Sequence, residues 1–196
     1  MRSISVIKEN RGYVWFAFSL FVVGLLIGLV FFEPLHGFLK QYLRHLEQIA
    51  AEAKGDHLDL SLLLFKNNLT VSLVLLGSGV FLSILSIHLL VINGMVVGYA
   101  LALMGQMGQA PVWALILFGI LPHGVLEIPA FLIAGAMGIK LGYMWLRPMV
   151  GKTRWESFRY AFKEALLALP VIALLLVAAA AIEGFVTPVL LTWYMK

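Results

Sequence analysis

The stretch LPHGVLEIPAFLIAG, residues 121–135, decides how this chain is interpreted. It places His123 and Glu127 inside an apolar run that is long enough to cross a membrane. An ionisable side chain at the centre of a bilayer costs at least about 2.5–3.5 kcal/mol on insertion scales. We therefore expect both side chains to face other helices or a cavity rather than lipid.

The composition around this stretch is that of an integral membrane protein. Of the 196 residues, 62% are hydrophobic and 12% are charged. Soluble domains carry about a quarter charged residues, so this chain has too few charges to cover a water-facing surface. The expected fold class is an all-α integral membrane protein, with residues 1–196 forming a single polytopic domain in the lipid bilayer.

Charge and motif content exclude several classes of function. The net charge of +4 is typical of basic residues beside membrane spans and does not indicate nucleic-acid binding. The absence of cysteine excludes disulfides and cysteine-based metal sites. No phosphate-binding loop, HExxH or GxSxG pattern is present, so we expect no enzyme activity.

Apolar runs predict about five transmembrane helices, one of them broken or re-entrant. The Asn93-Gly94 dipeptide is a turn signal and divides one long apolar run into two spans. Pro122, His123 and Gly124 interrupt another. The predicted spans are about 13–32, 69–92, 95–109, 112–144 with a break near 122–124, and 166–192.

The broken span allows two interpretations. One is a kinked helix, with Pro122, Gly124 and Pro129 as the residues that disturb it. The other is a re-entrant half-helix, 112–121, followed by a full span that begins near Pro122. Irregular backbone at membrane depth is tolerated only inside protein or along a cavity. Both interpretations therefore place the break inside the bundle.

Two amphipathic segments lie outside the predicted spans. Residues 35–60 alternate apolar and polar faces at helical spacing, with balanced charge that suits the external side. Residues 152–165 form a basic helix, which is expected to be cytoplasmic. The distribution of lysine and arginine along the chain predicts a cytoplasmic N-terminus and an external C-terminus, with the protein in the cell membrane. Small residues in the spans, such as Gly24 and Gly28, would support a homodimer.

The candidate site is an intramembrane polar cluster. Its members are His123, Glu127, Glu183, Asn68 and Asn93. On the structural hypothesis, His123 and Glu127 pair with backbone groups freed by the helix break, and Glu127 is neutral. On the functional hypothesis, intramembrane acids mark an ion path or a proton relay. No cofactor is required, although His123, Glu127 and Glu183 could together hold a divalent cation.

Four segments resemble the stage II sporulation protein M family, a family of integral membrane proteins. They are FKNNLTVSL (65–73), VINGMVVGYAL (91–101), LPHGVLEIPAFLIAGAMGIKLG (121–142) and AIEGFVTP (181–188). The resemblance implies a multi-span helical protein that, in spore-forming bacteria, anchors peptidoglycan-degrading proteins. The family pattern falls on Asn68, Asn93, His123, Glu127, Pro129 and Glu183, to which the resemblance assigns no chemistry.

Two functions follow as expectations. The first is a membrane scaffold that recruits other membrane or cell-envelope proteins through segments 35–60 and 152–165. The second is an ion or small-solute transporter, or the membrane subunit of a transport complex, that uses His123, Glu127 and Glu183. Broken helices with acids at the break are the usual pointer to a transport site.

Overall fold

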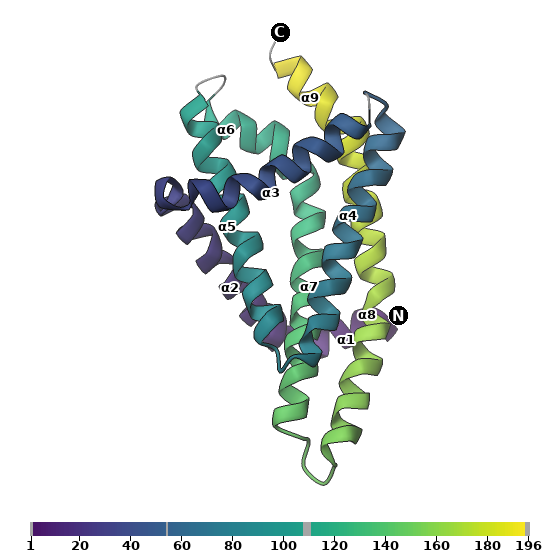
Figure 1. Ribbon diagram of the computed structural model, residues 1–196. Coiled ribbons are helices and arrows are strands. Elements are labelled where there is room, and N and C mark those ends of the chain that lie inside the picture. Colours follow the sequence, from purple (N-terminus) through teal and green to yellow (C-terminus); the bar gives the residue numbers. More distant parts are fainter. Residues whose placement is uncertain (1, 54, 108–110, 195–196) are drawn as a thin grey trace.

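The chain forms a bundle of long helices with shorter helices lying across it (Figure 1). The computed structural model describes residues 2–53, 55–107 and 111–194, and all the regular structure in these ranges is helical. The elements are α1 (Arg2–Glu9), α2 (Arg11–Val30), α3 (Phe32–Glu52), α4 (His57–Gly77), the 3₁₀ turn η1 (Ser78–Val80), α5 (Ile84–Met107), α6 (Val112–Ala114), the π-helical η2 (Leu115–Ile120), α7 (Leu121–Leu146), α8 (Arg154–Ala181), the π-helical η3 (Ile182–Val186) and α9 (Thr187–Tyr194).

Five helical stretches in the described ranges are long and apolar enough to cross a membrane. A span needs about 20 predominantly apolar residues, and each stretch meets that length. The stretches are Arg11–Val30, His57–Val80, Ile84–Gln106, Leu115–Leu146 and Arg154–Tyr194. The all-α class and the expected number of spans are confirmed, and by length and composition the chain is a multi-pass membrane protein.

The predicted boundary between the second and third spans is wrong. The turn lies between α4 and α5 at residues 78–83, where Leu82 and Ser83 have φ angles of 55° and 68°. Asn93 and Gly94 instead lie within α5, so the predicted spans 69–92 and 95–109 are displaced. Residues 108–110, which include the predicted end of the third span, lie outside the described residues.

Tertiary contacts explain why the turn lies at residues 78–83. The Ser83 hydroxyl donates to the Ile139 carbonyl at 2.7 Å, and a Cβ on Gly79 would lie 2.1 Å from the Gly138 carbonyl oxygen. These contacts fix the turn against α7. Asn93 is accommodated within α5 because its side chain donates to the Leu89 carbonyl at 2.8 Å.

Glycines on α2 and α5 allow these two helices to pack with their backbones in close approach. A Cβ on Gly24 would lie 2.1 Å from the Val91 carbonyl oxygen, and one on Gly98 would lie 2.0 Å from that of Leu25. Gly28 and Gly94 make equivalent approaches. The small residues expected to support a homodimer are therefore used within one chain, since close backbone approach needs residues without a side chain.

The helix break before α7 is a π-helical segment. In Figure 1, α6 and the segment after it run across the upper end of the bundle before the chain turns down into α7. Pro122 lies at the start of α7, as is usual for proline in a first helical turn. Gly124 and Pro129, which were predicted to disturb the helix, lie inside the continuous α7. The helical structure runs without interruption from Val112 to Leu146, and the break is a π-helical segment within it.

The predicted basic helix 152–165 and the predicted span 166–192 begin as one continuous helix, α8. Thr153 caps α8, because its hydroxyl accepts from the Glu156 N–H at 3.2 Å while the Glu156 carboxylate accepts from the Thr153 N–H at 2.7 Å. The α7–α8 hairpin extends below the other helices in Figure 1, and α9 lies at the opposite end.

The amphipathic character expected of segment 35–60 belongs to α3, which ends at Glu52, while α4 already begins at His57. Residue 54 of that segment lies outside the described residues. Helix α3 crosses the upper part of the bundle in Figure 1. The Tyr99 hydroxyl of α5 lies 2.9 Å from His36 Nδ1, and the Tyr99 ring stacks on Phe32. These contacts fix α3 against α5.

Candidate functional site

His123 and Glu183 form an ion pair between two elements that lie far apart in the sequence. His123 lies in the first turn of α7, immediately after the π-helical η2, and Glu183 lies within the π-helical η3. π-helical turns are rare and occur frequently at functional sites. The pair therefore connects the two spans that contain the π-helical segments η2 and η3.

The start of α4 supports the π-helical geometry of η3. The His57 ring donates from Nδ1 to the Gly184 carbonyl at 2.7 Å, so this carbonyl has a partner outside its own helix. A Cβ on Gly184 would lie 1.9 Å from the Ser61 Oγ, which leaves no room for a larger residue. Helix α4 thus packs directly on η3 and fixes the position of Glu183 beside His123.

Glu127 is the third ionisable member of the cluster. It lies one helical turn after His123 on α7, so the two side chains share one face of the helix. The side chains of Asn68 on α4, His123 and Glu183 line the same cavity as Glu127. Asn68 in turn accepts a hydrogen bond from Asn67 at 3.2 Å. The carboxylate of Glu127 therefore faces the bundle, not lipid.

Three cavities adjoin Glu127. The first, of about 270 Å³, lies between α4, α7 and α8 and is also lined by Asn68, His123 and Glu183. The second, of about 140 Å³, lies between α2, α4, α5 and α7 and is also lined by Asn68 and Asn93. The third, of about 390 Å³, lies between α3, α5, η2 and η3 and is also lined by His123 and Glu183. All five residues of the predicted polar cluster thus line space around Glu127.

The charges in this region do not balance when all three groups are ionised. Two carboxylates, Glu127 and Glu183, lie beside one histidine, and among the described residues no lysine or arginine lines any of the three cavities. Within the described ranges, no three histidine or acidic side chains are grouped closely enough to hold a metal ion. The site can therefore accept one further positive charge, as a proton or as a cationic group of a solute.

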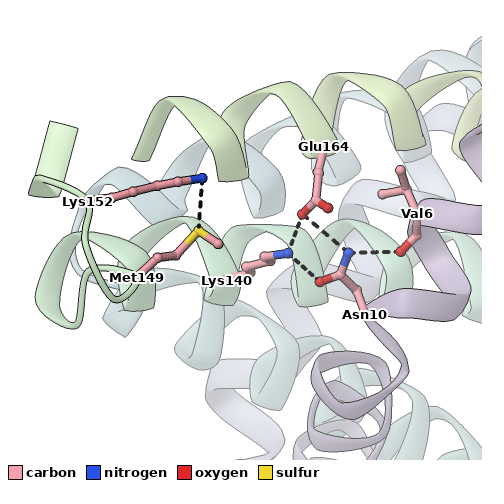
Figure 2. Close-up of polar contacts among 6 residues, drawn as sticks. All are labelled: Val6, Asn10, Lys140, Met149, Lys152 and Glu164. Carbon is pink, nitrogen blue, oxygen red and sulfur yellow. Dashed lines mark hydrogen bonds and ion pairs between the residues drawn. The ribbon is translucent and has the colours of Figure 1, made fainter. Parts of the chain in front are cut away.

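A second buried polar cluster was not predicted from the sequence. Figure 2 shows Lys140 of α7 paired with Glu164 of α8, with Asn10 at the junction of α1 and α2 completing the group. The Lys140 ammonium donates to the Asn10 side-chain oxygen at 2.6 Å, and the Asn10 amide donates to the Val6 carbonyl at 2.8 Å. The Lys140 ammonium, the Asn10 amide and the Glu164 carboxylate each have a partner within the cluster, which indicates a structural role.

A signal for this second cluster was present in the sequence. Lys140 follows an apolar run without interruption, and Glu164 shares one helical face with the small apolar residues Ala161, Ala165 and Ala168. Lys140 lies within the predicted span 112–144, and only 5% of its surface is exposed. Buried charges in proteins are almost always paired, so an opposite charge on the adjacent helix was the feature to look for.

Comparison with known proteins gives a consistent family match. The family model described as Stage II sporulation protein M matches residues 17–188. The chain is also similar to two proteins of Methanocaldococcus jannaschii. It is 26% identical to the uncharacterized protein MJ0706 over 189 residues, which cover 91% of this chain and 83% of that protein. It is 29% identical to the uncharacterized protein MJ0793 over 129 residues, which cover 66% and 71%. No solved structure gives a significant match.

Proposed function

This chain belongs to the stage II sporulation protein M family, and we propose that it binds a small, positively charged solute inside the membrane and helps to move it across. The observation that carries the proposal is the excess of carboxylates at the cluster. Glu127 and Glu183 face a single histidine, His123, beside cavities that no lysine or arginine of the described ranges lines.

The physical basis is the low dielectric of the membrane interior. A charge imbalance there is far more costly than in water, so a cationic solute that restores balance is bound strongly. Broken helices at membrane depth commonly form the binding sites of transporters. Here η2 and η3 are two such breaks, and the His123–Glu183 pair connects them. We propose no catalytic step.

The size of the chain limits how it would act alone. With five candidate spans in the described ranges, we propose that it works as a homodimer or as the membrane subunit of a larger complex. We propose the cell membrane as its location, with the N-terminus cytoplasmic and the C-terminus external. The exposed basic residues of the α7–α8 connection, Arg147, Lys152 and Arg154, support this orientation.

The test is uptake into liposomes that contain the purified protein. Radiolabelled guanidinium and tetramethylammonium are suitable probes, because both are permanently charged and do not leak as neutral amines. With an inside-negative potential, we expect uptake above that of empty liposomes. Glu127→Gln and Glu183→Gln should reduce it at least tenfold, while Glu33→Gln, at an exposed acid of α3, should not. Uptake equal to that of empty liposomes for both ions would contradict the proposal.

A scaffold is the second candidate, and the exposed face of α3 favours it. This helix is not among the candidate spans, and its Leu39 side chain is fully buried against the bundle. Phe38 and Tyr42 are 48% and 40% exposed on the other side, with their ring centroids 5.6 Å apart. Because α3 is fixed on α5, this aromatic pair is available to a partner protein of the membrane or cell envelope.

Partner capture separates the scaffold from the transporter. Cross-linking in native membranes followed by purification should recover a specific partner with the wild-type chain. Phe38→Ala together with Tyr42→Ala should lose it, while Lys40→Ala, at an exposed position between them, should retain it. Recovery that is unchanged by the double replacement would argue against an α3-mediated scaffold. Neither result depends on the carboxylates of the buried cluster.

A further inference from the structure

The cavity of about 390 Å³ has two chemically different halves, and this difference indicates what it binds. One half is apolar and is formed by one face of α5, including Val96, Ala100 and Met104, together with η2. The other half contains the ionisable cluster and the side chain of Thr187, the first residue of α9. We call this space the amphipathic cavity. Such a combination of apolar walls and a few convergent polar groups is typical of small-molecule sites.

Thr187 provides an independent sign that the amphipathic cavity has a ligand. Its side chain is 3% exposed, and its hydroxyl has no hydrogen-bond partner among the residues that the structure describes. Threonines in helices usually donate to the carbonyl four residues earlier. Thr70 and Thr192 of this chain do so, each at 2.7 Å. Thr187 does not, and a buried polar group without a partner calls for a specific explanation.

The charges around the cavity restrict the ligand further. In the part of the chain that the structure describes, its lining includes Glu127 and Glu183 and no lysine or arginine. An anionic ligand would meet two carboxylates of the same sign. A neutral ligand would not supply the missing positive charge, so one carboxylate would have to take up a proton instead. A head group that carries one positive charge and N–H donors can pair with the carboxylates and also donate to the Thr187 hydroxyl.

We infer that the solute is an amphiphilic amine, with its ammonium head between Glu127, Glu183 and Thr187 and its hydrocarbon body in the apolar half of the amphipathic cavity. This inference rests on the proposed function, because it names the chemical class of the solute. The apolar half distinguishes an amine of this kind from a bare proton, which needs no such space. The carboxylates distinguish it from a lipid acyl chain, which needs no such head group.

Binding to the chain in nanodiscs tests the inference. The probes are methylamine, butylamine and hexylamine at neutral pH, with hexanol and hexanoate as neutral and anionic controls. Affinity should rise about threefold to fourfold for each added methylene, as expected when a hydrocarbon body becomes buried. Hexylamine should bind at least tenfold more tightly than hexanol or hexanoate. Affinities refer to the free aqueous concentration of each probe, so that partition into lipid is accounted for.

Matched variants test the roles of the polar half and the apolar half of the amphipathic cavity separately. Thr187→Val keeps the shape of the side chain and removes the hydroxyl, so hexylamine binding should weaken about threefold to tenfold. Ala100→Phe fills the apolar half and should abolish the gain in affinity from methylamine to hexylamine. If Ala100→Phe fails to fold, Ala100→Leu should reduce the gain. Val189→Thr, at an exposed position of α9, is the control and should bind like the wild type.

Two results would overturn the inference. One is an affinity that does not change from methylamine to hexylamine. The other is hexanol binding as tightly as hexylamine, which would mean that the carboxylates do not recognise the head group. The inference and the proposed function can fail separately. Guanidinium uptake that persists in Ala100→Phe, without preference for longer amines, would support a small-cation transporter and exclude the amphiphilic solute.

Discussion

Lys140 of α7 and Glu164 of α8 form an ion pair in which only 5% and 6% of the two residues are exposed. The rings of Tyr13 and Tyr160 lie 5.9 and 5.2 Å from the Lys140 ammonium, so aromatic faces as well as Asn10 surround the charge. This pair connects α7 and α8 with the residue that joins α1 to α2. It therefore holds the N-terminal helix on the bundle.

Removing one member of the pair should destabilise the chain strongly. Lys140→Met leaves Glu164 buried without its partner, and such a change costs about 3–5 kcal/mol. Unfolding in mixed detergent micelles measures the loss. The combination Lys140→Met with Glu164→Leu should recover most of it, because no uncompensated charge remains. A double variant as unstable as the single one would show that the pair is needed for more than charge balance.

The glycine contacts of α2 and α5 give a second prediction. Gly98→Leu places a side chain 2.0 Å from the Leu25 carbonyl oxygen, so the two helices must separate. The loss of stability should exceed the roughly 1–3 kcal/mol of ordinary overpacking, because backbone atoms cannot move aside as side chains do. Gly37→Leu is the control, since a Cβ there meets nothing within 4 Å. Thermal unfolding in detergent compares them, and equal melting temperatures would contradict the packing.

The close packing of α4 on η3 should also determine the position of Glu183 in the polar cluster. Gly184→Ala would place its Cβ 1.9 Å from the Ser61 Oγ, which displaces η3 and with it Glu183. Guanidinium uptake should fall at least tenfold. Ser61→Gly in the same chain removes the nearer obstruction and should restore part of the uptake, because the His57 carbonyl oxygen still lies 2.7 Å from the added Cβ. If the second change restores nothing, the defect of Gly184→Ala does not arise from this contact.

Asp56 lies outside the candidate spans and allows a prediction about how the stability of α4 depends on pH. Its carboxylate accepts from the Asp59 N–H at 3.0 Å and from the Leu58 N–H at 2.7 Å, and these bonds hold the pKa of Asp56 below its usual value of 3.8. A depressed pKa means that the cap stabilises the first turn of α4 above pH 3.8. That stabilisation is lost as the pH falls through the folded pKa.

Hydrogen exchange of the first turn of α4 tests this cap. Protection, corrected for the intrinsic pH dependence of exchange, should be constant from neutral pH to about pH 4, near the ordinary aspartate pKa, and should fall below it. Asp56→Ala should lack the added protection at every pH, and Asp59→Asn is the control. Unchanged protection in Asp56→Ala would show that the cap contributes nothing to this turn.

The sequence predicted the fold class and the number of spans because apolar runs determine both locally. The turn between α4 and α5 could not be placed in the same way. Asn93-Gly94 is a strong local turn signal, yet in the structure Gly94 serves the contact with α2. The local preference was overridden by packing between segments that are distant in the sequence.

Part of the candidate site could also be predicted from the sequence, because that part depends on local sequence features. Ionisable residues in apolar runs stand out, so His123, Glu127 and Glu183 could be selected as candidates. The ion pair of His123 with Glu183 could not be predicted, because it depends on how η3 packs against α7 and α4. Glu164 was not selected as a candidate because polar residues lie near it on α8. Its position on the buried face of that helix is therefore not apparent from the sequence.

The most direct test of the account is whether residues 123 and 183 lie in contact within the membrane-embedded chain. The chain has no cysteine, so His123→Cys with Glu183→Cys introduces the only two thiols. A short bifunctional thiosulfonate should bridge them within one chain, as measured by intact mass. His123→Cys with Val150→Cys, which lies in the connection between α7 and α8, should instead add two separate reagents. Separate labelling of residues 123 and 183, in a chain that remains folded, would contradict the central claim that the two broken helices meet there.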